Sequence, residues 1–219
     1  MHETTQISYG LGTVDIILNS ESSTGISDPH FRFTDYDQVL CSCFTPKELE
    51  QISEGEHAGI TFNLVLTDAP DSELESSLFR FEEISGKFYA DLEEGLFINL
   101  EAYKTLGDSE PRKLEMFSEK TEFRLNIPDN LKENDREYFL YTTSLGGSEL
   151  YEDTDRDADT ISINAGTIGN SILLYREISF MSSSAKQPLA ILNPQYICVV
   201  GIVLLLLLWK RIDFLHKKE

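Results

Sequence analysis

The sequence predicts a mainly β protein, an antiparallel immunoglobulin-like β-sandwich module with one or two short helices, followed by a single C-terminal transmembrane helix. Several short segments alternate apolar and polar residues, and polar turns separate them at short spacing. One stretch near the C-terminus is far more apolar than the rest. We therefore expect a disordered or fragment N-terminus (1–13), an extracellular β-rich module (14–178), a linker (179–188), a membrane helix (189–209) and a basic cytoplasmic tail (210–219).

Composition limits the class of protein. The chain has 219 residues, with 18 Lys plus Arg against 38 Asp plus Glu, and a formal net charge of −20. Hydrophobic residues make up 41% of it, enough for a packed core, which argues against a wholly disordered chain. An acidic surface repels phosphate backbones, so nucleic acid is a poor partner. Three cysteines are too few for a disulfide scaffold.

The first part of the module contains two predicted strands and a predicted helix. Residues 14–18 and 60–67 are rich in aliphatic and β-branched side chains, as strands are. A helix starts at Thr45, because its hydroxyl can cap the first turn, Pro46 suits that turn, and Glu48 completes a capping box. The helix should end near Gly55.

A second helix is predicted over residues 71–85. Its apolar side chains recur at helical spacing, and Gly86 follows as a terminator. Leu74, Leu78, Phe81 and Ile84 form this apolar stripe.

The second part of the module reads as a series of strands. Residues 96–103 alternate strictly, and the polar turn at 107–110 leads into a hairpin partner at 112–117. Gly146 and Gly147 are a strong hairpin signal between two later strands. The further strands are predicted at 122–127, 137–143, 149–152, 160–164 and 171–177. Short strands broken by polar turns indicate a sandwich.

Five motifs follow one another in a family-like order. They are Phe123-Arg124-Leu125-Asn126-Ile127-Pro128, Arg136-Glu137-Tyr138-Phe139, the aspartates of 153–159, Asp159-Thr160-Ile161-Ser162-Ile163 and Tyr175-Arg176-Glu177. In this order they resemble the terminal β-module of large surface proteins of Gram-positive bacteria, as a diverged copy. The resemblance covers about residues 14–178 and is one of strands and turns, not of catalytic residues. It implies an extracellular module at the cell surface or cell wall.

The C-terminal apolar stretch is read as a membrane anchor. Residues 197–209 alone span about 20 Å as a helix, too short for a hydrocarbon core of about 30 Å, but adding residues 189–196 gives twenty-one residues, which suffice. Tyr196 and Trp209 lie near the two ends, where amphipathic rings favour the headgroup region. Lys210 and Arg211 follow as the inner stop, so membrane lipid is an expected partner.

Charge predicts the orientation of this anchor. The tail holds four of the 18 basic and two of the 38 acidic residues, so the rest of the chain carries −22. Basic residues beside a span favour the cytoplasmic side, which places residues 1–186 outside. However, residues 1–11 show no signal peptide. The chain is then part of a longer precursor, or has a wrongly assigned start, or is a tail-anchored cytoplasmic adaptor; we favour the first two.

Asn193, Pro194 and Gln195 stand just before the continuous apolar run 197–209, as a remnant of a sortase signal would. Members of the family often end in such a signal, a hydrophobic span and a basic tail. The next residue supplies the carbonyl that a sortase cysteine attacks, and Tyr196 replaces the small residue expected there. A retained membrane anchor is therefore favoured over covalent attachment to the wall.

The alternating carboxylates Asp153, Asp155, Asp157 and Asp159 are the one candidate metal site, for calcium. Neither register of an EF-hand loop supplies the turn glycine or the bidentate glutamate, so a solvated acidic hairpin is the favoured interpretation. If Cys41 and Cys43 lie on a strand, their side chains point apart and a disulfide between them would be strained. No cofactor other than calcium is indicated.

These observations predict a non-enzymatic structural, spacer or interaction module. No nucleophile elbow, phosphate loop or zinc-protease motif occurs in the sequence. One alternative is a ligand-binding, calcium-assisted adhesin whose partner is peptidoglycan or a host or environmental surface ligand. The other is the tail-anchored adaptor.

Overall fold

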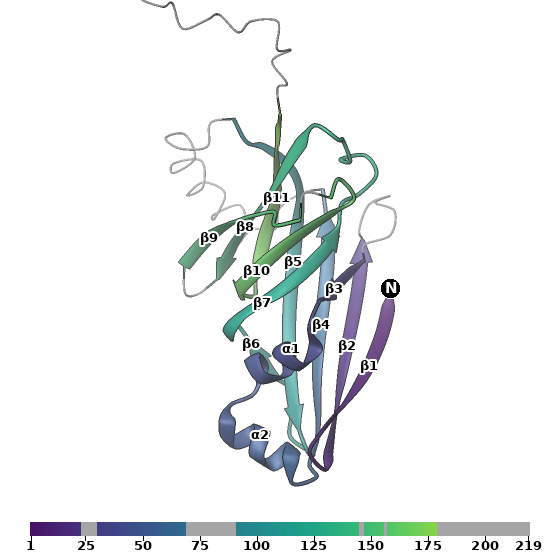
Figure 1. Ribbon diagram of the computed structural model, residues 1–219, viewed down its shortest axis with the longest axis vertical. Coiled ribbons are helices and arrows are strands. Elements are labelled where there is room, and N and C mark those ends of the chain that lie inside the picture. Colours follow the sequence, from purple (N-terminus) through teal and green to yellow (C-terminus); the bar gives the residue numbers. More distant parts are fainter. Residues whose placement is uncertain (23–29, 69–90, 145–146, 156, 179–219) are drawn as a thin grey trace, which may run out of the picture. The chain divides into compact units, whose positions relative to one another are not determined.

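The computed structural model describes residues 1–22, 30–68, 91–144, 147–155 and 157–178. Over these residues the chain is mainly β, with two short helices and two sheets (Figure 1). The strands are β1 (His2–Tyr9), β2 (Gly12–Ser22), β3 (Phe31–Phe33), β4 (His57–Thr67), β5 (Glu93–Leu106), β6 (Arg112–Leu114), β7 (Met116–Asn126), β8 (Arg136–Ser144), β9 (Gly147–Glu152), β10 (Thr160–Thr167) and β11 (Asn170–Glu177), and the helices are α1 (Tyr36–Cys43) and α2 (Pro46–Ser53).

The large sheet has the order β1-β2-β4-β5-β11-β8-β9, with β6 added to β5, and the small sheet has the order β10-β7-β3. Every pairing is antiparallel except that of β2 with β4, which is parallel. The expectation of an entirely antiparallel fold is therefore wrong at this pair. The chain between β2 and β4 forms β3, α1 and α2, a crossover long enough to return it to the same end of the sheet.

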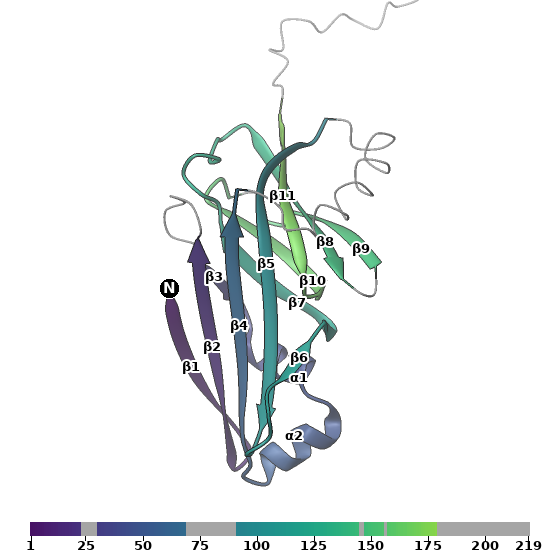
Figure 2. The same cartoon turned by 180° about the vertical axis from the view of Figure 1, so that it is seen from behind.

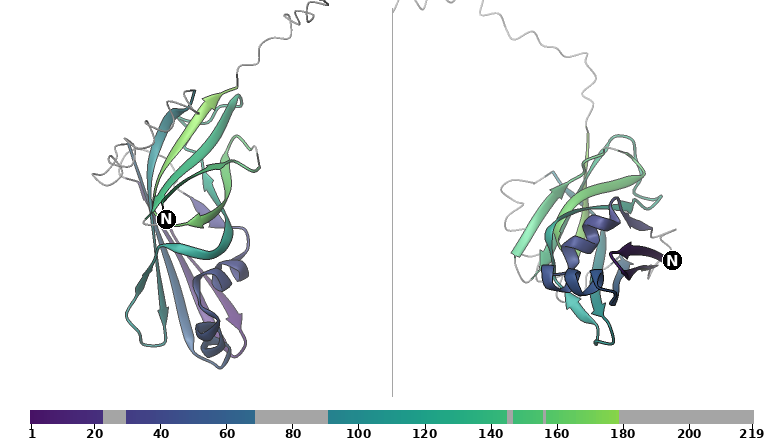
Figure 3. Two further views of the ribbon diagram at one scale, coloured as in Figure 1. Left: turned by 90° about the vertical axis from the view of Figure 1, so that its left-hand side faces the viewer. Right: turned by 60° about the horizontal axis from the view of Figure 1, so that its bottom comes forward.

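The main core lies between the two sheets. Alternate residues of β2 and β4 are fully buried, as period two requires of strands with one face on a core. Phe62 of the large sheet packs on Phe33 of β3, with ring centroids 4.7 Å apart, and on Phe117 of β7 at 6.3 Å. Figure 3 shows α1 and α2 on the same side of the large sheet as the small sheet.

Most of the predicted strands are confirmed, and they differ from the prediction in length more than in place. The predicted hairpin after β5 is present, but its second arm, β6, is only three residues long and Phe117 belongs to β7 in the other sheet. β8 and β9 pair antiparallel, with Ser144 opposite Gly147. The predicted helix over residues 71–85 lies outside the described residues.

The prediction of a disordered N-terminus is wrong for His2–Tyr9, which forms β1. This strand pairs with β2 over all eight of its residues, without a bulge. Gly10, at a φ of +64°, makes the turn between them, a conformation that favours glycine. The apolar residues of this segment are Ile7 and Tyr9, and both pack against the core. Two apolar residues are too few to show the alternation by which a strand is recognised in a sequence.

The capping box predicted at Thr45 is confirmed. The Glu48 backbone N–H donates to the Thr45 hydroxyl, and the Thr45 N–H donates to the Glu48 carboxylate at 2.8 Å. The strand predicted around Cys41 and Cys43 is wrong, because both belong to α1, which Asp35 caps by accepting from the backbone N–H at position 38. Cys41 is exposed and Cys43 is buried.

Glu48 also ties α2 to the large sheet. Its carboxylate accepts from the ammonium of Lys104 on β5 at 2.7 Å and from the guanidinium of Arg112 on β6. Burial raises the pKa of Glu48, but hydrogen bonds from Lys104, Thr45 and Arg112 outweigh it and lower that pKa from 4.5 to about 2. Lys104 also donates to the Cys43 carbonyl at 2.9 Å, so both helices are connected through one ammonium.

The lowered pKa of Glu48 predicts a pH dependence of stability. A folded-state pKa of about 2 against 4.5 means that this carboxylate stabilises the fold fully above pH 4.5. Its contribution is lost as pH falls from 4.5 towards 2. Urea unfolding at several pH values checks this: the stability gap between the native chain and Glu48→Gln should narrow through this window. A gap that is constant from pH 7 to pH 2 would contradict it.

Candidate functional site

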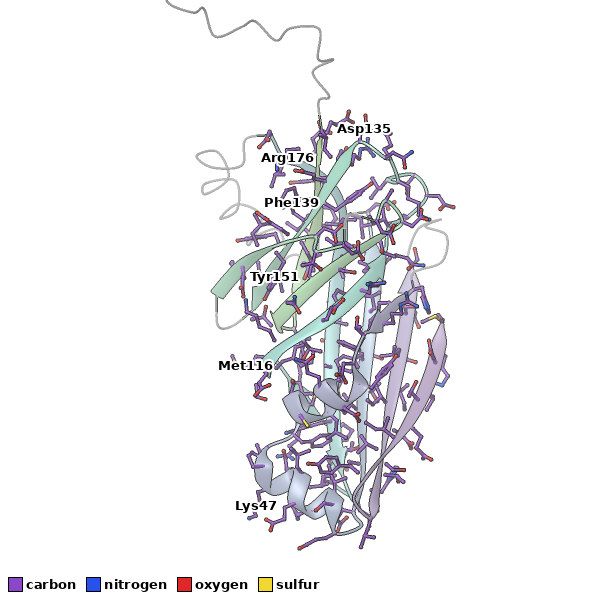
Figure 4. All side chains as sticks on the ribbon, viewed as in Figure 1. Lys47, Met116, Asp135, Phe139, Tyr151 and Arg176 are labelled. Carbon is purple, nitrogen blue, oxygen red and sulfur yellow. The ribbon has the colours of Figure 1, made fainter. Side chains whose placement is uncertain are left out.

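A groove of about 380 Å³ opens at one edge of the large sheet. It lies where β9 ends and the chain leaves the sheet into residues 153–159, here called the acidic hairpin. Figure 4 labels Arg176 and Phe139 in this region. The groove, called the edge groove below, is lined by Asn134, Arg136, Glu137, Tyr138, Phe139, Glu152, Asp153, Asp157, Arg176 and Ile178.

Two charged triplets meet beside the edge groove, which Arg136, Glu137, Tyr138 and Arg176 of these triplets line. The segments Arg136-Glu137-Tyr138 and Tyr175-Arg176-Glu177 run antiparallel, so each arginine stands opposite a glutamate and the tyrosines stand opposite each other. Arg176 Nε donates to Glu137 at 2.9 Å, and Arg136 Nη2 donates to Glu177 at 3.2 Å. Opposite charges in directly paired positions stabilise a sheet and fix its register.

Tyr138 and Arg136 hold the loop that precedes β8. The Tyr138 hydroxyl, on a side chain that is buried, donates to the Leu131 carbonyl at 2.7 Å and accepts from the Glu133 backbone N–H at 3.2 Å. Arg136 donates to the same carbonyl at 2.9 Å, and its guanidinium lies 4.2 Å from the centroid of the Tyr175 ring. The groove wall is thus rigid on the loop side.

The acidic hairpin folds back on the small sheet through two of its carboxylates. Asp153 accepts from the Ser162 backbone N–H at 2.9 Å, and Asp155 accepts from the Ser162 hydroxyl at 2.5 Å. Arg124 of β7 lies 3.6 Å from Asp155. Burial raises the pKa of Asp153; burial also acts on Asp155, but the hydrogen bond from Ser162 and the charge of Arg124 lower its pKa.

The calcium site predicted at the four aspartates stays a prediction. Asp153 and Asp155 accept hydrogen bonds from their own hairpin and β10, and Asp159 lies 3.6 Å from Lys132. Asp157 is exposed and faces the edge groove. In the described part of the chain, these four carboxylates do not converge as a close group of three.

One close group of three carboxylates does occur among the described residues, at Glu133, Asp135 and Glu177. Arg136 Nη2 lies 3.2 Å from both Glu133 and Glu177. The guanidinium already supplies positive charge to this cluster, which is therefore explained without a metal ion.

Removing the Asp155 side chain is expected to loosen the acidic hairpin. Asp155→Ala deletes the acceptor for Ser162, Thr160 and the Asp157 N–H, and should lower the free energy of unfolding by about 1–3 kcal/mol. Urea unfolding followed by circular dichroism measures the loss. Asp157→Ala, two residues away and exposed, is the matched control and should change stability by less than about 0.5 kcal/mol. Equal losses in the two variants would contradict this role for Asp155.

The remaining predicted site residues lie outside the described residues: Asn193, Pro194, Gln195, Tyr196, Trp209, Lys210 and Arg211. The described residues hold no helix with the length and apolarity that a membrane crossing requires. Comparison with known protein families, with curated proteins and with solved structures finds no match to this chain.

Sequence reasoning did not identify the edge groove. The signal was present, because Arg-Glu-Tyr and Tyr-Arg-Glu have complementary charges when two strands run antiparallel. The pairing of β8 with β11 brings these triplets together from positions about forty residues apart. Asp153 and Asp157 were predicted as site residues, and the structure places both in the lining of the groove.

Proposed function

We propose that residues 1–178 form a non-enzymatic structural or interaction module that the apolar segment 189–209 anchors in the cell membrane. The observation that carries the proposal is this segment of twenty-one residues, followed by Lys210 and Arg211, on an otherwise acidic chain. The described module ends at Ile178, so residues 179–188 connect it to the segment. Ten residues reach at most about 36 Å, which makes this a membrane-proximal module.

The large sheet is suited to a spacer because one strand runs through both of its halves. β5 has fourteen residues, about 46 Å when extended. Its C-terminal part pairs with β4, its N-terminal part pairs with β11, and residues 97–99 pair with both. A load on one half is therefore transmitted to the other through continuous backbone hydrogen bonds.

The proposal includes the resemblance of this module to the terminal β-modules of Gram-positive surface proteins. Two sheets packed on a common core support an immunoglobulin-like sandwich, and the parallel pair β2–β4 departs from it. A host or environmental surface ligand, or peptidoglycan, is the partner that such a module would have. The tail-anchored cytoplasmic adaptor is the competing assignment.

Protease shaving of intact cells tests the proposal. The chain carries one tag inserted between Ser22 and His30 and a second tag after Glu219, and it is expressed from its native gene context. The surface assignment expects loss of the first tag and retention of the second, with an internal cytoplasmic protein as the control for lysis. Protection of the first tag would refute it and favour the cytoplasmic adaptor.

Reversing the charge of the tail should disturb the orientation of the anchor. Lys210, Arg211, Lys217 and Lys218 are the basic residues that hold the tail inside, so replacing all four by Glu is expected to give mixed topology in the same shaving assay. A matched control replaces the three lysines of this set by Arg, which keeps the charge. If the Glu variant keeps the native orientation, the charges do not set the topology.

A second candidate function is ligand binding in the edge groove, which is favoured by its position beside the predicted calcium hairpin. Weak calcium sites of extracellular modules bind at about 10⁻⁴–10⁻³ M. A rise in melting temperature in this range of Ca²⁺, absent in Asp157→Asn, would support a calcium-assisted adhesin. A melting temperature that Ca²⁺ leaves unchanged would count against it.

A further inference from the structure

In the described part of the chain, the large sheet ends in the strands β1 and β9, and the small sheet ends in β10 and β3. An edge strand has backbone groups on one side that can pair with another chain, and proteins usually protect such edges. β9 carries Glu149 and Glu152, and β3 is only three residues long. The register of β10 shifts between Ala165 and Thr167. Charge, shortness and irregularity therefore protect these three edges.

The edge strand β1 lacks these protections. It is eight residues long, pairs with β2 at every position and contains neither proline nor lysine. Its one acidic residue is Glu3, in a chain that has 38. Figure 2 shows β1 at the margin of the large sheet, with β2 on one side and no described strand on the other. β1 is therefore a long, regular and weakly charged edge.

The register of β1 on β2 determines which of its backbone groups point outwards. The Ser20 N–H donates to the Met1 carbonyl at 3.0 Å, and the Met1 amino group donates to the Ser20 carbonyl at 2.5 Å. In an antiparallel pair, positions that exchange two hydrogen bonds in this way alternate with positions whose groups point away. The odd-numbered residues of β1 therefore bond to β2. The even-numbered residues direct their N–H and C=O groups to the open side: His2, Thr4, Gln6 and Ser8.

The side chains of these four residues are exposed and polar. They lie on the face of the sheet opposite to the core, where Gln6 donates to Asp15 of β2 at 2.7 Å. Ile7 and Tyr9, on the other face, pack against the core. A strand added to this edge therefore displaces no packed side chain, and it supplies partners for backbone groups that no described residue pairs.

We propose that β1 pairs antiparallel with β1 of a second copy of this chain, so that two large sheets join edge to edge. A two-fold axis at Thr5 gives the longest overlap, because residues 2–8 of one copy then stand opposite residues 8–2 of the other. In this register His2 faces Ser8 and Thr4 faces Gln6 of the partner copy, so every outward-pointing residue meets another. Each of these pairs exchanges two backbone hydrogen bonds.

Charge favours this register. The two copies of Glu3 lie four positions apart along the strands, about 14 Å, which exceeds the Debye length of about 8 Å at physiological ionic strength. A register in which Glu3 faces Glu3 places like charges directly opposite each other, which destabilises a sheet. In the proposed register Thr5 faces Thr5, a pair whose hydroxyls can hydrogen-bond across the strands.

The proposed dimer is weak, because an edge of eight residues is smaller than a standard interface of about 20–30 residues a side. It forms at high local concentration. The inference does not rest on the membrane anchor, since β1 and β2 both belong to the described module.

Cysteine crosslinking tests the contact and its register. Cys41 is exposed and Cys198 lies in the apolar segment, so both are replaced by Ser, whereas the buried Cys43 is kept. In this background the full chain is made with Thr5→Cys or, as the matched control, with Thr4→Cys. The purified protein in a mild detergent is oxidised with copper phenanthroline, and the disulfide-linked dimer is measured on a non-reducing gel.

In the proposed dimer the two copies of Thr5 face each other with Cα atoms about 4.5 Å apart, within the range of about 4.4–6.8 Å that a disulfide needs. The two copies of Thr4 are offset by two positions, about 8 Å, which is too far. We therefore expect about tenfold more dimer from Thr5→Cys than from Thr4→Cys. Random collisions give the opposite bias, because Thr4 is the more exposed of the two. Equal yields, or no dimer from Thr5→Cys, would overturn the proposal.

Proline at position 4 gives a second readout. The Thr4 N–H points to the open side, so Thr4→Pro keeps the hydrogen bonds between β1 and β2 but removes a donor and places a ring in the path of the partner strand. Added to Thr5→Cys, Thr4→Pro should lower the yield of dimer about fivefold or more, whereas Thr4→Ala should leave it unchanged. Equal melting temperatures of the two variants serve as the control for folding. If both variants give the same yield of dimer, the outward edge of β1 is not the contact between the copies.

Discussion

Glu48→Ala is expected to destabilise the module by about 3–5 kcal/mol. Glu48 and Lys104 are each only 11% exposed at their side chains, and their charged atoms are 2.7 Å apart. Removing the carboxylate leaves the Lys104 ammonium buried without its counter-charge, and it also removes half of the capping box at Thr45. Urea unfolding of the purified chain at pH 7, followed by circular dichroism, measures the loss.

A double variant separates the buried charge from other effects of the substitution. In Glu48→Leu with Lys104→Met both charges are replaced by apolar groups, which mutational experience on buried ion pairs shows to be close to neutral. The double variant should therefore be more stable than Glu48→Ala. Arg112→Ala should cost less than either single change at the buried pair, because the Arg112 side chain is 57% exposed. A double variant as unstable as Glu48→Ala would show that the unpaired ammonium is not the cause.

The elements that could be predicted from the sequence are those with a local signal. The capping box at Thr45 and the alternating strands depend on residues within a few positions of one another, so they appear in the sequence as they do in the structure. α1 was missed because Cys41 and Cys43, two positions apart, have the spacing of a strand, and the cap at Asp35 stands outside that pattern. Strand β1 was not predicted because pairing with β2 stabilises it, and this pairing leaves no local signal in the sequence.

The arrangement of the sheets could not be predicted, since it rests on contacts between distant residues. Nothing near β2 or β4 indicates that they pair in parallel, because that depends on the path of the chain through β3 and both helices. The same holds for the acidic hairpin. Its aspartates are evident in the sequence, but their hydrogen bonds to Ser162 and the approach of Arg124 require β10 and β7 to be side by side.

Phe62→Ala is expected to lower the free energy of unfolding by about 3–5 kcal/mol. The Phe62 side chain is fully buried, and its ring contacts Phe33 and Phe117, which belong to the two strands β3 and β7 of the small sheet. The substitution removes an aromatic ring from the interface between the sheets and leaves a cavity that rigid strands cannot close. The loss is measured by urea unfolding, together with the slope of the transition.

Val65→Ala is the matched control for this prediction. Val65 lies three residues along the same strand, on the face of β4 opposite to the core, and is only half-buried. Its truncation should cost about 1 kcal/mol or less. If Phe62→Ala and Val65→Ala lose equal stability, the contact between the sheets does not hold the fold together. A much larger loss for Phe62→Ala would show that the buried aromatic contact between the sheets contributes more to stability than the opposite face of β4 does.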